Sequence, residues 1–495
     1  MNVQSTPAAE AGVRNIDLMI GDRDVPAQRG ATFERCNPVS GAVVTRAAAA
    51  SAADAAAAAD AAGAAFPAWA ALGPNARRTL LLRFAEVLQQ MANEFAAAMV
   101  DEIGATAGWA QFNAMLAAGM MREAAALTTQ VCGETIPSDR PGCIAMAVRQ
   151  PAGVVLGIAP WNAPVILGVR AIATPLACGN TVVLKASEIC PRTHRLIGEA
   201  ARAAGLPAGV VNVVSNAPAD AAQVVAALIA HPAVRRVNFT GSTAVGRKIA
   251  ELAARHLKPA LLELGGKAPL LILDDADIDE AVNAAVFGAF MNQGQICMST
   301  EKIVVHESIA DEFARKLVAR ARALPAGDPS TGKVVLGSMV SAEAAQRVQR
   351  LIDDAVAKGA QLALAGGAQG SIRSAAVLDR VPRVADIYAE ESFGPVVCIV
   401  RVKDDEEAIR VANDTEYGLT SAVYSRDVSR ALRIAQRLQA GMCHINGPTV
   451  HDEAQMPFGG TKGSGYGRFG GKAGIAEFTE LRWITIDTER VHYPF

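Results

Sequence analysis

From position 151 onward, short runs rich in β-branched residues alternate with longer stretches of helical spacing. The predicted strands are Gly153 to Ile158, Thr181 to Lys185, Val210 to Val214 and Arg236 to Phe239, and the predicted helices are Thr193 to Ala204 and Ala219 to Ala230. This alternation is typical of β-α-β units, whose strands run parallel. The sequence therefore predicts a doubly wound α/β sheet with ligands beyond the carboxyl ends of its strands.

A second region of the same alternation begins near Leu270. Its predicted strands are Leu270 to Leu273, Lys302 to Val305, Val396 to Val400 and Ala422 to Tyr424, and its predicted helices are Ile278 to Phe290, Ile309 to Ala323 and Ala342 to Lys358. A chain of 495 residues is too long for one ordinary core. We therefore expect two α/β domains, with a hinge at Leu262 to Lys267, where Gly265 and Gly266 permit unusual backbone angles.

Two helices are predicted before position 151. The segment Ala47 to Phe66 is almost entirely alanine, which is the best helix former. The segment Arg77 to Met99 places apolar residues at three- and four-residue spacing, which predicts one amphipathic helix. Neither segment carries residues that suggest chemistry.

Charge and hydropathy exclude several classes of protein. The formal net charge is −2 and the basic residues are scattered, so we expect no nucleic-acid partner. The most apolar region, Pro151 to Leu184, is broken by prolines, a glycine and an arginine, so it cannot form one membrane-spanning helix. Met1 to Glu10 lacks the basic start and apolar run of a signal peptide. We therefore expect neither export nor membrane insertion.

The cysteines indicate a reducing compartment. The eight lie far apart and form no C-x-x-C pair, namely Cys36, Cys132, Cys143, Cys178, Cys190, Cys297, Cys398 and Cys443. This distribution disfavours a disulfide framework and a zinc site, so we expect a cytoplasmic protein without a metal. Most of these residues are expected to be small buried hydrophobes.

One cysteine has neighbours that suit catalysis. Cys297 follows the helix predicted to end near Met291 and lies in a loop of small and polar residues, where a thiol can face a cleft. By itself such a cysteine is more often structural.

Two polar residues elsewhere in the chain could serve such a cysteine. Glu263 is flanked by three leucines and two glycines. This apolar setting would raise the pKa of its carboxyl and suit a general base, and a buried ion pair is the alternative. Asn162 lies between two prolines, where its amide could donate to an oxyanion or simply form the turn.

Together these motifs resemble the aldehyde dehydrogenase superfamily, and the resemblance extends in order and spacing over essentially the whole chain. It implies that Cys297 is the nucleophile, that Glu263 activates the hydrolytic water, and that Asn162 and the Cys297 backbone N–H form the oxyanion hole. The implied reaction proceeds through a thiohemiacetal and a thioester to a carboxylic acid.

The resemblance also implies a site for NAD. Gly241, Ser242 and Gly246 lie where a strand ends and a helix begins, a place suited to a pyrophosphate, although a helix cap by Ser242 is the simpler interpretation. Lys185 and Glu188 match the contacts to the adenosine ribose, and a carboxylate there favours NAD over NADP, which may be tolerated. The nicotinamide end is assigned to four further residues, namely Trp161, Gly265, Glu391 and Phe393.

Departures from the pattern of aliphatic-aldehyde enzymes suggest the substrate. Arg170 occupies a position where those relatives have a large aromatic residue, and Trp109 lies on a helix expected to face the substrate tunnel. The chain looks closest to bacterial aromatic aldehyde dehydrogenases, which act on salicylaldehyde, benzaldehyde or vanillin. The remaining expected pocket residues are Met291, Ile296, Met298 and Phe458. A salt bridge is the equal alternative for Arg170.

Three other functions remain open on the sequence. A semialdehyde dehydrogenase of aliphatic catabolism would share the same motifs. A CoA-acylating dehydrogenase would not require the water-activating Glu263, and a non-catalytic structural protein of the same fold would be expected to have lost either Cys297 or Glu263. Both residues are present.

The resemblance divides the chain into three parts. Residues 1–132 and 151–262 are expected to bind NAD, residues 263–440 to form the catalytic domain, and residues 133–150 and 441–495 to supply an oligomerisation hairpin, the C-terminal return segment and a loop at the site. The hairpin, Gly133 to Arg149, should project from the body, and Leu481 to Ile486 should pair with a partner subunit in a homodimer or homotetramer.

Overall fold

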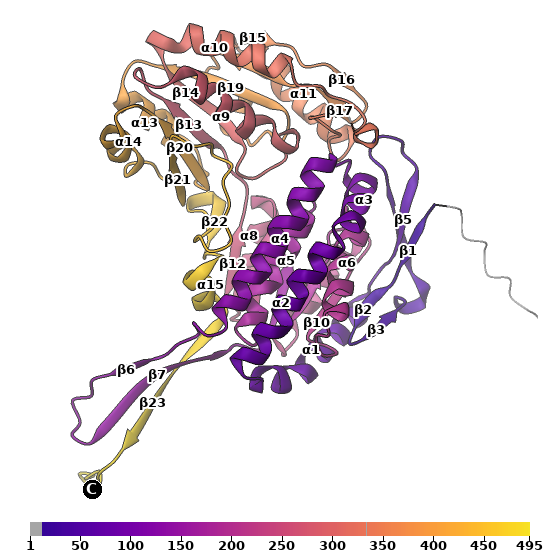
Figure 1. Ribbon diagram of the computed structural model, residues 1–495, viewed down its shortest axis with the longest axis vertical. Coiled ribbons are helices and arrows are strands. Elements are labelled where there is room, and N and C mark those ends of the chain that lie inside the picture. The colour runs from indigo at the N-terminus through magenta and orange to yellow at the C-terminus, as the bar shows by residue number, and fades with distance from the viewer. Residues whose placement is uncertain (1–11, 333) are drawn as a thin grey trace, which may run out of the picture.

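Two largely parallel sheets organise the molecule, one in each lobe, and a narrow arm projects from the lobe that contains the first sheet (Figure 1). The computed structural model describes residues 12–332 and 334–495. Met1 to Glu10, on which the expectation about a signal peptide rests, lie outside the described residues. Within the described ranges, no helix combines the length and the apolar character needed to cross a membrane.

The first sheet has eight strands in the order β22-β12-β11-β8-β9-β10-β2-β3. The strands are β2 (Leu18–Ile20), β3 (Arg23–Val25), β8 (Val154–Ile158), β9 (Thr181–Lys185), β10 (Val211–Val214), β11 (Val234–Thr240), β12 (Ala260–Glu263) and β22 (Gly465–Tyr466). The five central strands are parallel, and the chain winds from β8 outward in both directions. The doubly wound sheet expected from the sequence is confirmed.

Helices cover both faces of this sheet. They are α1 (Ala52–Ala71), α2 (Pro74–Gln90), α3 (Ala92–Ile103), α4 (Ala107–Leu127), α5 (Pro164–Ala177), α6 (Pro191–Ala203), α7 (Ala221–Ala230) and α8 (Thr243–Arg255). Alternate residues of β9 serve the two cores, since Val182 and Leu184 pack into one and Val183 into the other. Burial on both faces explains why these strands are almost continuously apolar and do not alternate between apolar and polar residues.

The second sheet has seven strands in the order β15-β18-β19-β14-β13-β20-β21. They are β13 (Ala268–Ile272), β14 (Thr300–His306), β15 (Gln361–Leu364), β18 (Ala376–Asp379), β19 (Val396–Val402), β20 (Thr420–Tyr424) and β21 (Met442–Ile445), and only β15 is antiparallel. Its covering helices are α9 (Ile278–Phe290), α10 (Glu307–Arg322), α11 (Ala342–Ala357), α13 (Asp405–Asn413) and α14 (Val428–Ala435). The predicted strands and helices of both sheets agree with the structure to within a few residues.

Two N-terminal predictions need correction. Ala47 and Ala48 end strand β5 (Val43–Ala48), which pairs with β4 (Thr32–Cys36), and the helix begins only after Ser51, whose side chain accepts a hydrogen bond from the Asp54 backbone N–H. Alanine alone does not mark such a boundary, because the cap and the strand pairing set it. The single helix expected over 77–99 is broken at Met91 into α2 and α3, although the apolar spacing continues across the break.

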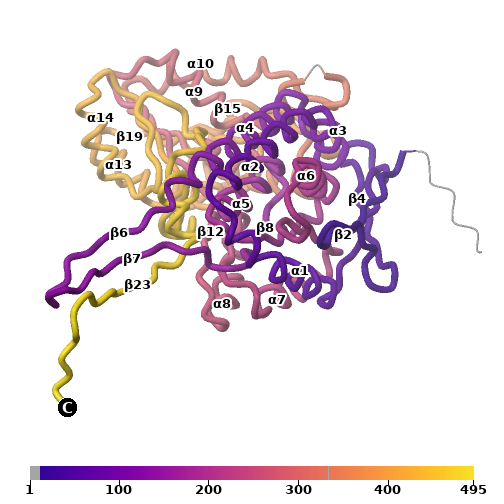
Figure 2. The backbone as a smooth tube through the Cα atoms, turned by 60° about the horizontal axis from the view of Figure 1, so that its bottom comes forward, coloured from indigo at the N-terminus to yellow at the C-terminus, as the bar shows by residue number. Residues whose placement is uncertain are grey.

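The arm is a three-stranded antiparallel sheet made by this chain alone. It contains β6 (Glu134–Ile136), β7 (Cys143–Pro151) and β23 (Thr479–Asp487), which lie side by side in Figures 1 and 2. The projecting hairpin is therefore present. Within the chain, Trp483 pairs with Ala147 of β7, and β23 is the edge strand of this sheet, so the expected pairing of Leu481 to Ile486 with a partner subunit stays a prediction.

Candidate active site

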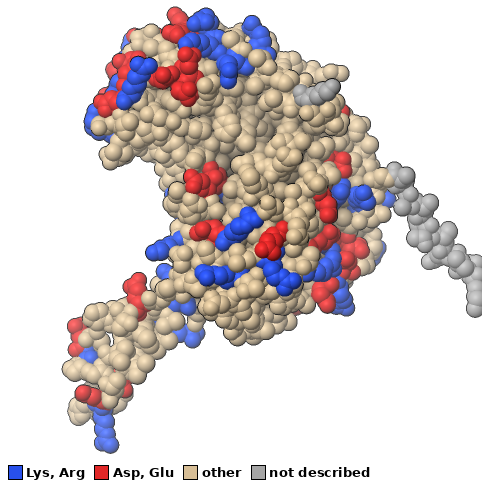
Figure 3. Space-filling view, in the orientation of Figure 1, with Lys and Arg blue, Asp and Glu red and all other residues tan. Residues whose placement is uncertain are grey.

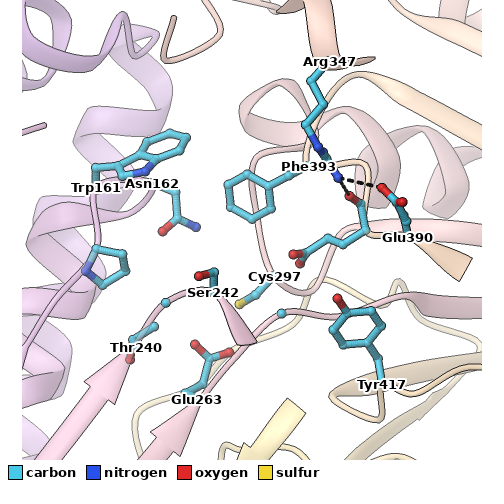
Figure 4. A pocket seen from close by; sticks show the side chains of 14 residues that line it. Trp161, Asn162, Thr240, Ser242, Glu263, Cys297, Arg347, Glu390, Phe393 and Tyr417 are labelled. Carbon is cyan, nitrogen blue, oxygen red and sulfur yellow. Dashed lines mark hydrogen bonds and ion pairs between the residues drawn. The ribbon is translucent and has the colours of Figure 1, made fainter. Parts of the chain in front are cut away.

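A cavity of about 490 Å³ lies between the two lobes (Figure 4). It is lined by Pro160, Trp161, Asn162, Thr240, Gly241, Ser242, Glu263, Gly265, Cys297, Arg347, Glu390, Glu391, Phe393 and Tyr417. The first sheet contributes residues at the carboxyl ends of β8, β11 and β12, which the strand register places at a common edge. The second sheet contributes residues that precede its strands β13, β14 and β19. The rule that ligands bind at carboxyl ends therefore holds for the first sheet only.

Cys297 is presented by a tightly turned loop after α9. Asn292, Gln293 and Gly294 all have left-handed backbone angles, with φ of 47°, 57° and 69°. A Cβ on Gly294 would lie 2.2 Å from the carbonyl oxygen of Gly394, so only glycine fits there. The Cys297 thiol is half-buried and faces the cavity (Figure 4). The loop thus fixes the thiol where a small molecule can reach it.

Glu263 ends strand β12 and is almost completely buried, with 1% of its surface exposed. Burial raises the pKa of its carboxyl from 4.5 to about 7, and a hydrogen bond with the Cys297 thiol offsets only part of that effect. Its Oε1 receives no hydrogen bond from any described residue. The raised pKa expected from the apolar neighbours is confirmed, and the free oxygen is available to a water or a proton donor.

The pKa of the Cys297 thiol is raised as well. Its pKa lies well above the ordinary value of 9.0, first because of burial and then because of the nearby Glu263 carboxylate. The thiol is therefore protonated at rest, and forming the nucleophilic thiolate requires a proton acceptor. Glu263 is within hydrogen-bonding reach of it.

Three hydrogen bonds hold Asn162. The indole Nε1 of Trp109 and the amide Nδ2 of Asn292 each donate to its backbone carbonyl, both at 3.0 Å. Its own side-chain Nδ2 donates to the carbonyl of Gln295, also at 3.0 Å, two residues before Cys297. A primary amide has two N–H groups, so one remains for an oxygen beside the thiol. Trp109, expected to line the substrate pocket, thus supports the backbone of this turn.

A second cavity of about 600 Å³ continues from the first and shares Pro160, Trp161, Thr240, Gly241 and Ser242 with it. At its far end, Lys185 forms an ion pair with Glu188, and Asn216 Nδ2 donates to Glu188 Oε1 at 2.9 Å. The walls between these ends are apolar and include Val225, Phe239, Ile249 and Leu252. Such a groove, with a flat apolar slot between polar ends, fits the size and chemistry of a dinucleotide.

The turn at the start of α8 suits close approach by a phosphate. A Cβ on Gly246 would lie 2.4 Å from a methyl group of Leu264, so glycine is needed for the helix to pack on β12. Ser242 caps the helix by accepting from the Val245 N–H at 3.4 Å, as the simpler interpretation expected. Gly241, Ser242 and Val245 at this helix end line the groove, where the helix dipole favours an anion.

The segment around Glu391 and Phe393 closes the other end of the cavity. Glu391 Oε1 accepts from the Gly266 N–H at 2.9 Å, and burial raises the pKa of this carboxyl to about 8. A Cβ on Gly265 would lie 2.6 Å from Glu391 Oε2, which explains the glycine. The rings of Trp161 and Phe393 meet edge to face at 5.8 Å, so these two predicted residues do border the same space.

The sequence interpretation missed the residues that hold this segment. Glu301 is buried, forms an ion pair with Lys267 at 2.7 Å, and accepts hydrogen bonds from the Ser392 and Phe393 N–H groups at 3.0 and 3.1 Å. Arg347 donates to the carbonyls of Ser392 and Glu391 at 2.9 and 2.7 Å, as a second support (Figure 4). Neither residue lies in a recognisable motif, so only the fold brings them here.

The expected substrate residues divide into two groups. Ile296, Met298 and Phe458 are buried in one apolar core around the Cys297 loop, and Met291 packs against it. Arg170 is buried beside them and forms an ion pair with Asp452, so the salt bridge that the sequence left as an alternative is present. Asp452 could not be identified from the sequence, because only the fold shows that its carboxylate lies beside Arg170.

Comparison with known proteins identifies the family. The sequence model of the aldehyde dehydrogenase family matches residues 25–484. A vanillin dehydrogenase of Pseudomonas fluorescens is 62% identical over 480 residues, covering 97% of this chain and 99% of that protein.

Two crystal structures are also similar. That of a salicylaldehyde dehydrogenase from Pseudomonas putida G7, complexed with salicylaldehyde, has a TM-score of 0.96 at 50% identity and matches 97% of this chain and 100% of that one. That of PnpE in complex with nicotinamide adenine dinucleotide has a TM-score of 0.92 at 37% identity and matches 97% and 99% of the two chains. This chain belongs to the aldehyde dehydrogenase family.

Proposed function

We propose that this chain oxidises aromatic aldehydes to carboxylic acids, with NAD⁺ as the hydride acceptor. The observation that carries the proposal is the convergence of Cys297, Glu263 and Asn162 at one end of a cavity that continues into a dinucleotide-sized groove. The names of the similar vanillin and salicylaldehyde dehydrogenases support an aromatic substrate. Residues 1–132 and 151–262 would bind NAD, and residues 263–440 would carry the nucleophile.

The first step is attack by the Cys297 sulfur on the aldehyde carbon. The thiol must lose its proton, and the free carboxylate oxygen of Glu263 is placed to receive it directly or through a water. The new carbon–sulfur bond leaves an alkoxide on the former carbonyl oxygen. The second N–H of Asn162 and the Cys297 backbone N–H would stabilise that charge, and losing one such donor typically slows a reaction about 100- to 1,000-fold.

The second half of the reaction removes the acyl group. Bound NAD⁺ would supply the acceptor for the hydride that leaves the tetrahedral carbon, and the product on the protein is a thioester of Cys297. Glu263 first passes the proton of the thiol to solvent and then takes a proton from water as the water attacks this thioester. The attack releases the acid and the Cys297 thiolate, to which Glu263 returns that proton. With a pKa of about 7, Glu263 can accept protons near neutral pH and return them.

The far end of the groove favours NAD over NADP. The Glu188 carboxylate can accept hydrogen bonds from the two hydroxyls of a ribose, whereas it would repel a 2′-phosphate. Lys185 and Asn216 hold that carboxylate in place. Because Lys185 also offers a positive charge, weak use of NADP is compatible with this arrangement.

A substrate panel tests the proposed aromatic specificity. An aromatic ring that buries about 80 Å² more apolar surface than acetaldehyde gains about 2 kcal/mol, or roughly 30-fold in kcat/KM if the contact persists in the transition state. We therefore expect benzaldehyde, salicylaldehyde and vanillin to exceed acetaldehyde and succinate semialdehyde when NADH formation is measured. Faster turnover of acetaldehyde than of benzaldehyde would reject the aromatic assignment.

The raised pKa of Glu263 predicts a pH-dependent cost to stability. A carboxyl whose folded-state pKa rises from 4.5 to about 7 costs the folded protein nothing below pH 4.5 and about 3 kcal/mol above pH 7. We expect Glu263→Gln to unfold at a higher temperature than the parent, and we expect the difference to be larger at pH 8.5 than at pH 5. The amide does not ionise at either pH, whereas the buried carboxyl of the parent is ionised at pH 8.5. The exposed Glu86→Gln is the control. An equal difference at both pH values would contradict the burial.

We also propose that the arm mediates homo-oligomerisation, as a dimer or a tetramer. Its sheet exposes apolar side chains, namely Ile136, Ile144, Val148, Leu481, Trp483 and Ile486, and Trp483 is 76% exposed. On the face shown in Figure 3, the middle of the arm is uncharged, and charged side chains lie along its edges and at its tip. An exposed apolar sheet of this kind is typical of an interface.

Light scattering after gel filtration tests the oligomer. We expect the parent to be a dimer or tetramer and Trp483→Asp to shift the population towards monomer, because a charge would be buried at the contact. Val428→Asp changes an equally apolar exposed residue on α14 and should leave the mass unchanged. An active monomeric parent at low concentration would contradict the proposal.

A further inference from the structure

The ion pair between Arg170 and Asp452 is buried against the ring of Phe458. Its two side chains are 7% and 10% exposed. Arg170 lies almost two turns into α5, about 9 Å along the helix axis from its first residue. Its guanidinium carbon lies 4.2 Å from the centre of the Phe458 ring, so the charge is stacked on an aromatic wall as well as paired.

One carboxylate oxygen of Asp452 has no hydrogen-bond partner among the described residues. Oδ2 is engaged by Arg170, whereas Oδ1 is buried and receives no hydrogen bond from any described residue. A buried carboxylate oxygen without a donor is costly, and such groups are uncommon outside functional sites. Asp452 therefore has one strong hydrogen-bond acceptor that the protein itself does not use.

That oxygen belongs to a residue that lines two adjoining cavities. One, of about 20 Å³, is bordered by Arg170 and Phe458, and the other, of about 430 Å³, opens between α4 and the loop at 452–455. Asp452 lines both, together with Glu123, Glu453 and Ala454. A molecule in the space between α4 and this loop would therefore contact Asp452.

The pair is also close to the reacting groups. Phe458 belongs to the same apolar core as Ile296 and Met298, the neighbours of Cys297 in sequence. The charge of Arg170 lowers the pKa of both Cys297 and Glu263, and that of Asp452 raises the pKa of Glu263, so the pair acts electrostatically on the reacting groups. Asp452 and Arg170 therefore belong to the charged surroundings of the thiol.

We propose that Asp452 Oδ1 accepts a hydrogen bond from a phenolic hydroxyl on the ring of the bound aldehyde, so that this residue selects hydroxybenzaldehydes over unsubstituted ones. The inference rests on the proposed oxidation of aromatic aldehydes. Arg170 holds the other oxygen of this carboxylate. Because Arg170 is two turns from the Asn162 end of α5, the matching hydroxyl is the one opposite the aldehyde group, in the para position.

The negative charge of Asp452 explains both why a ring hydroxyl is favoured and why rings without one are disfavoured. A hydroxyl donates to a carboxylate strongly, since hydrogen bonds to ionised groups are about twice as strong as neutral ones. A phenolate or a second carboxylate has no proton to donate and is repelled by Asp452. A ring without the hydroxyl leaves Oδ1 buried and unpaired, which is the situation in which enzymes discriminate best against the missing group.

The experiment compares 4-hydroxybenzaldehyde with benzaldehyde in the holoenzyme. The ratio of their kcat/KM values should favour the hydroxylated ring in the parent and fall roughly 10-fold in Asp452→Asn, with benzaldehyde much less affected. The parent's ratio should also fall as the pH rises through the pKa of the substrate phenol, and in Asp452→Asn this fall should be smaller. A purely structural role for Asp452 would not produce the second result.

A paired variant covers the possibility that Asp452→Asn folds poorly, because that change leaves Arg170 buried without a partner. Arg170→Met combined with Asp452→Leu replaces the whole pair by apolar residues of similar volume, which proteins often tolerate. It should still oxidise benzaldehyde and should lose the hydroxyl preference roughly 10- to 100-fold. Asp379→Asn, at another buried arginine–aspartate pair on β18, should leave the ratio unchanged.

Two results would overturn the inference while the parent still oxidises benzaldehyde. One is an unchanged ratio in both Asp452 variants, and the other is an equal loss on both substrates. A parent that oxidises neither aldehyde would instead overturn the proposed function, and this inference with it.

Discussion

The burial of Glu263 beside Cys297 is the constraint on which the rest of the site depends. An acid at the end of β12 loses its hydration, and its pKa rises to about 7. The thiol next to it is disfavoured as a thiolate for the same reason. Placing both groups in one apolar gap costs stability, and it yields a base that can exchange protons near neutral pH. The two sheets meet at this gap, so neither lobe forms it alone.

The surrounding contacts serve to keep that gap in a fixed shape. Asn162 is tied to the Cys297 loop through Gln295 and Asn292, so a shift of either lobe would move the amide and the thiol together. The Glu391 segment is anchored by the buried Lys267–Glu301 pair. Buried pairs of this kind contribute little net stability, and they fix the position of what they touch. Preorganised donors lower a reaction barrier because they need no rearrangement during the reaction.

Much of the fold could be predicted from the sequence, because strands that are buried on both faces appear in it as short runs of β-branched residues. Val182, Val183 and Leu184 illustrate this, since all three are fully buried. Boundaries set by capping or pairing were not predictable from periodicity, as the late start of α1 and the break at Met91 show. The pairing of β23 with β7 of the same chain was not predicted, because an apolar run does not reveal which strand lies beside it.

The candidate site was predictable where one short segment carries the chemistry. Cys297, Glu263 and Asn162 each lie in such a segment, and the structure brings them to one cavity. Glu301, Arg347 and Asp452 act through partners 34 or more residues away in the chain, so the sequence around each of them looks ordinary. Arg170 shows the same limit, because its salt bridge could be recognised only when Asp452 was placed.

The central claim is that the substrate's acyl group is held on Cys297 as a thioester. The most direct measurement is mass spectrometry of Glu263→Gln quenched in acid seconds after mixing with NAD⁺ and benzaldehyde, followed by peptide mapping. The account predicts a benzoyl adduct on the peptide that contains Cys297. The adduct forms more slowly than in the parent, because solvent must take the proton of the thiol, and it lasts longer, because no carboxylate activates the hydrolytic water. No adduct is expected in the double variant Cys297→Ala with Glu263→Gln. NADH formation by Cys297→Ala at the parent's rate, or an adduct on any other residue, would contradict it.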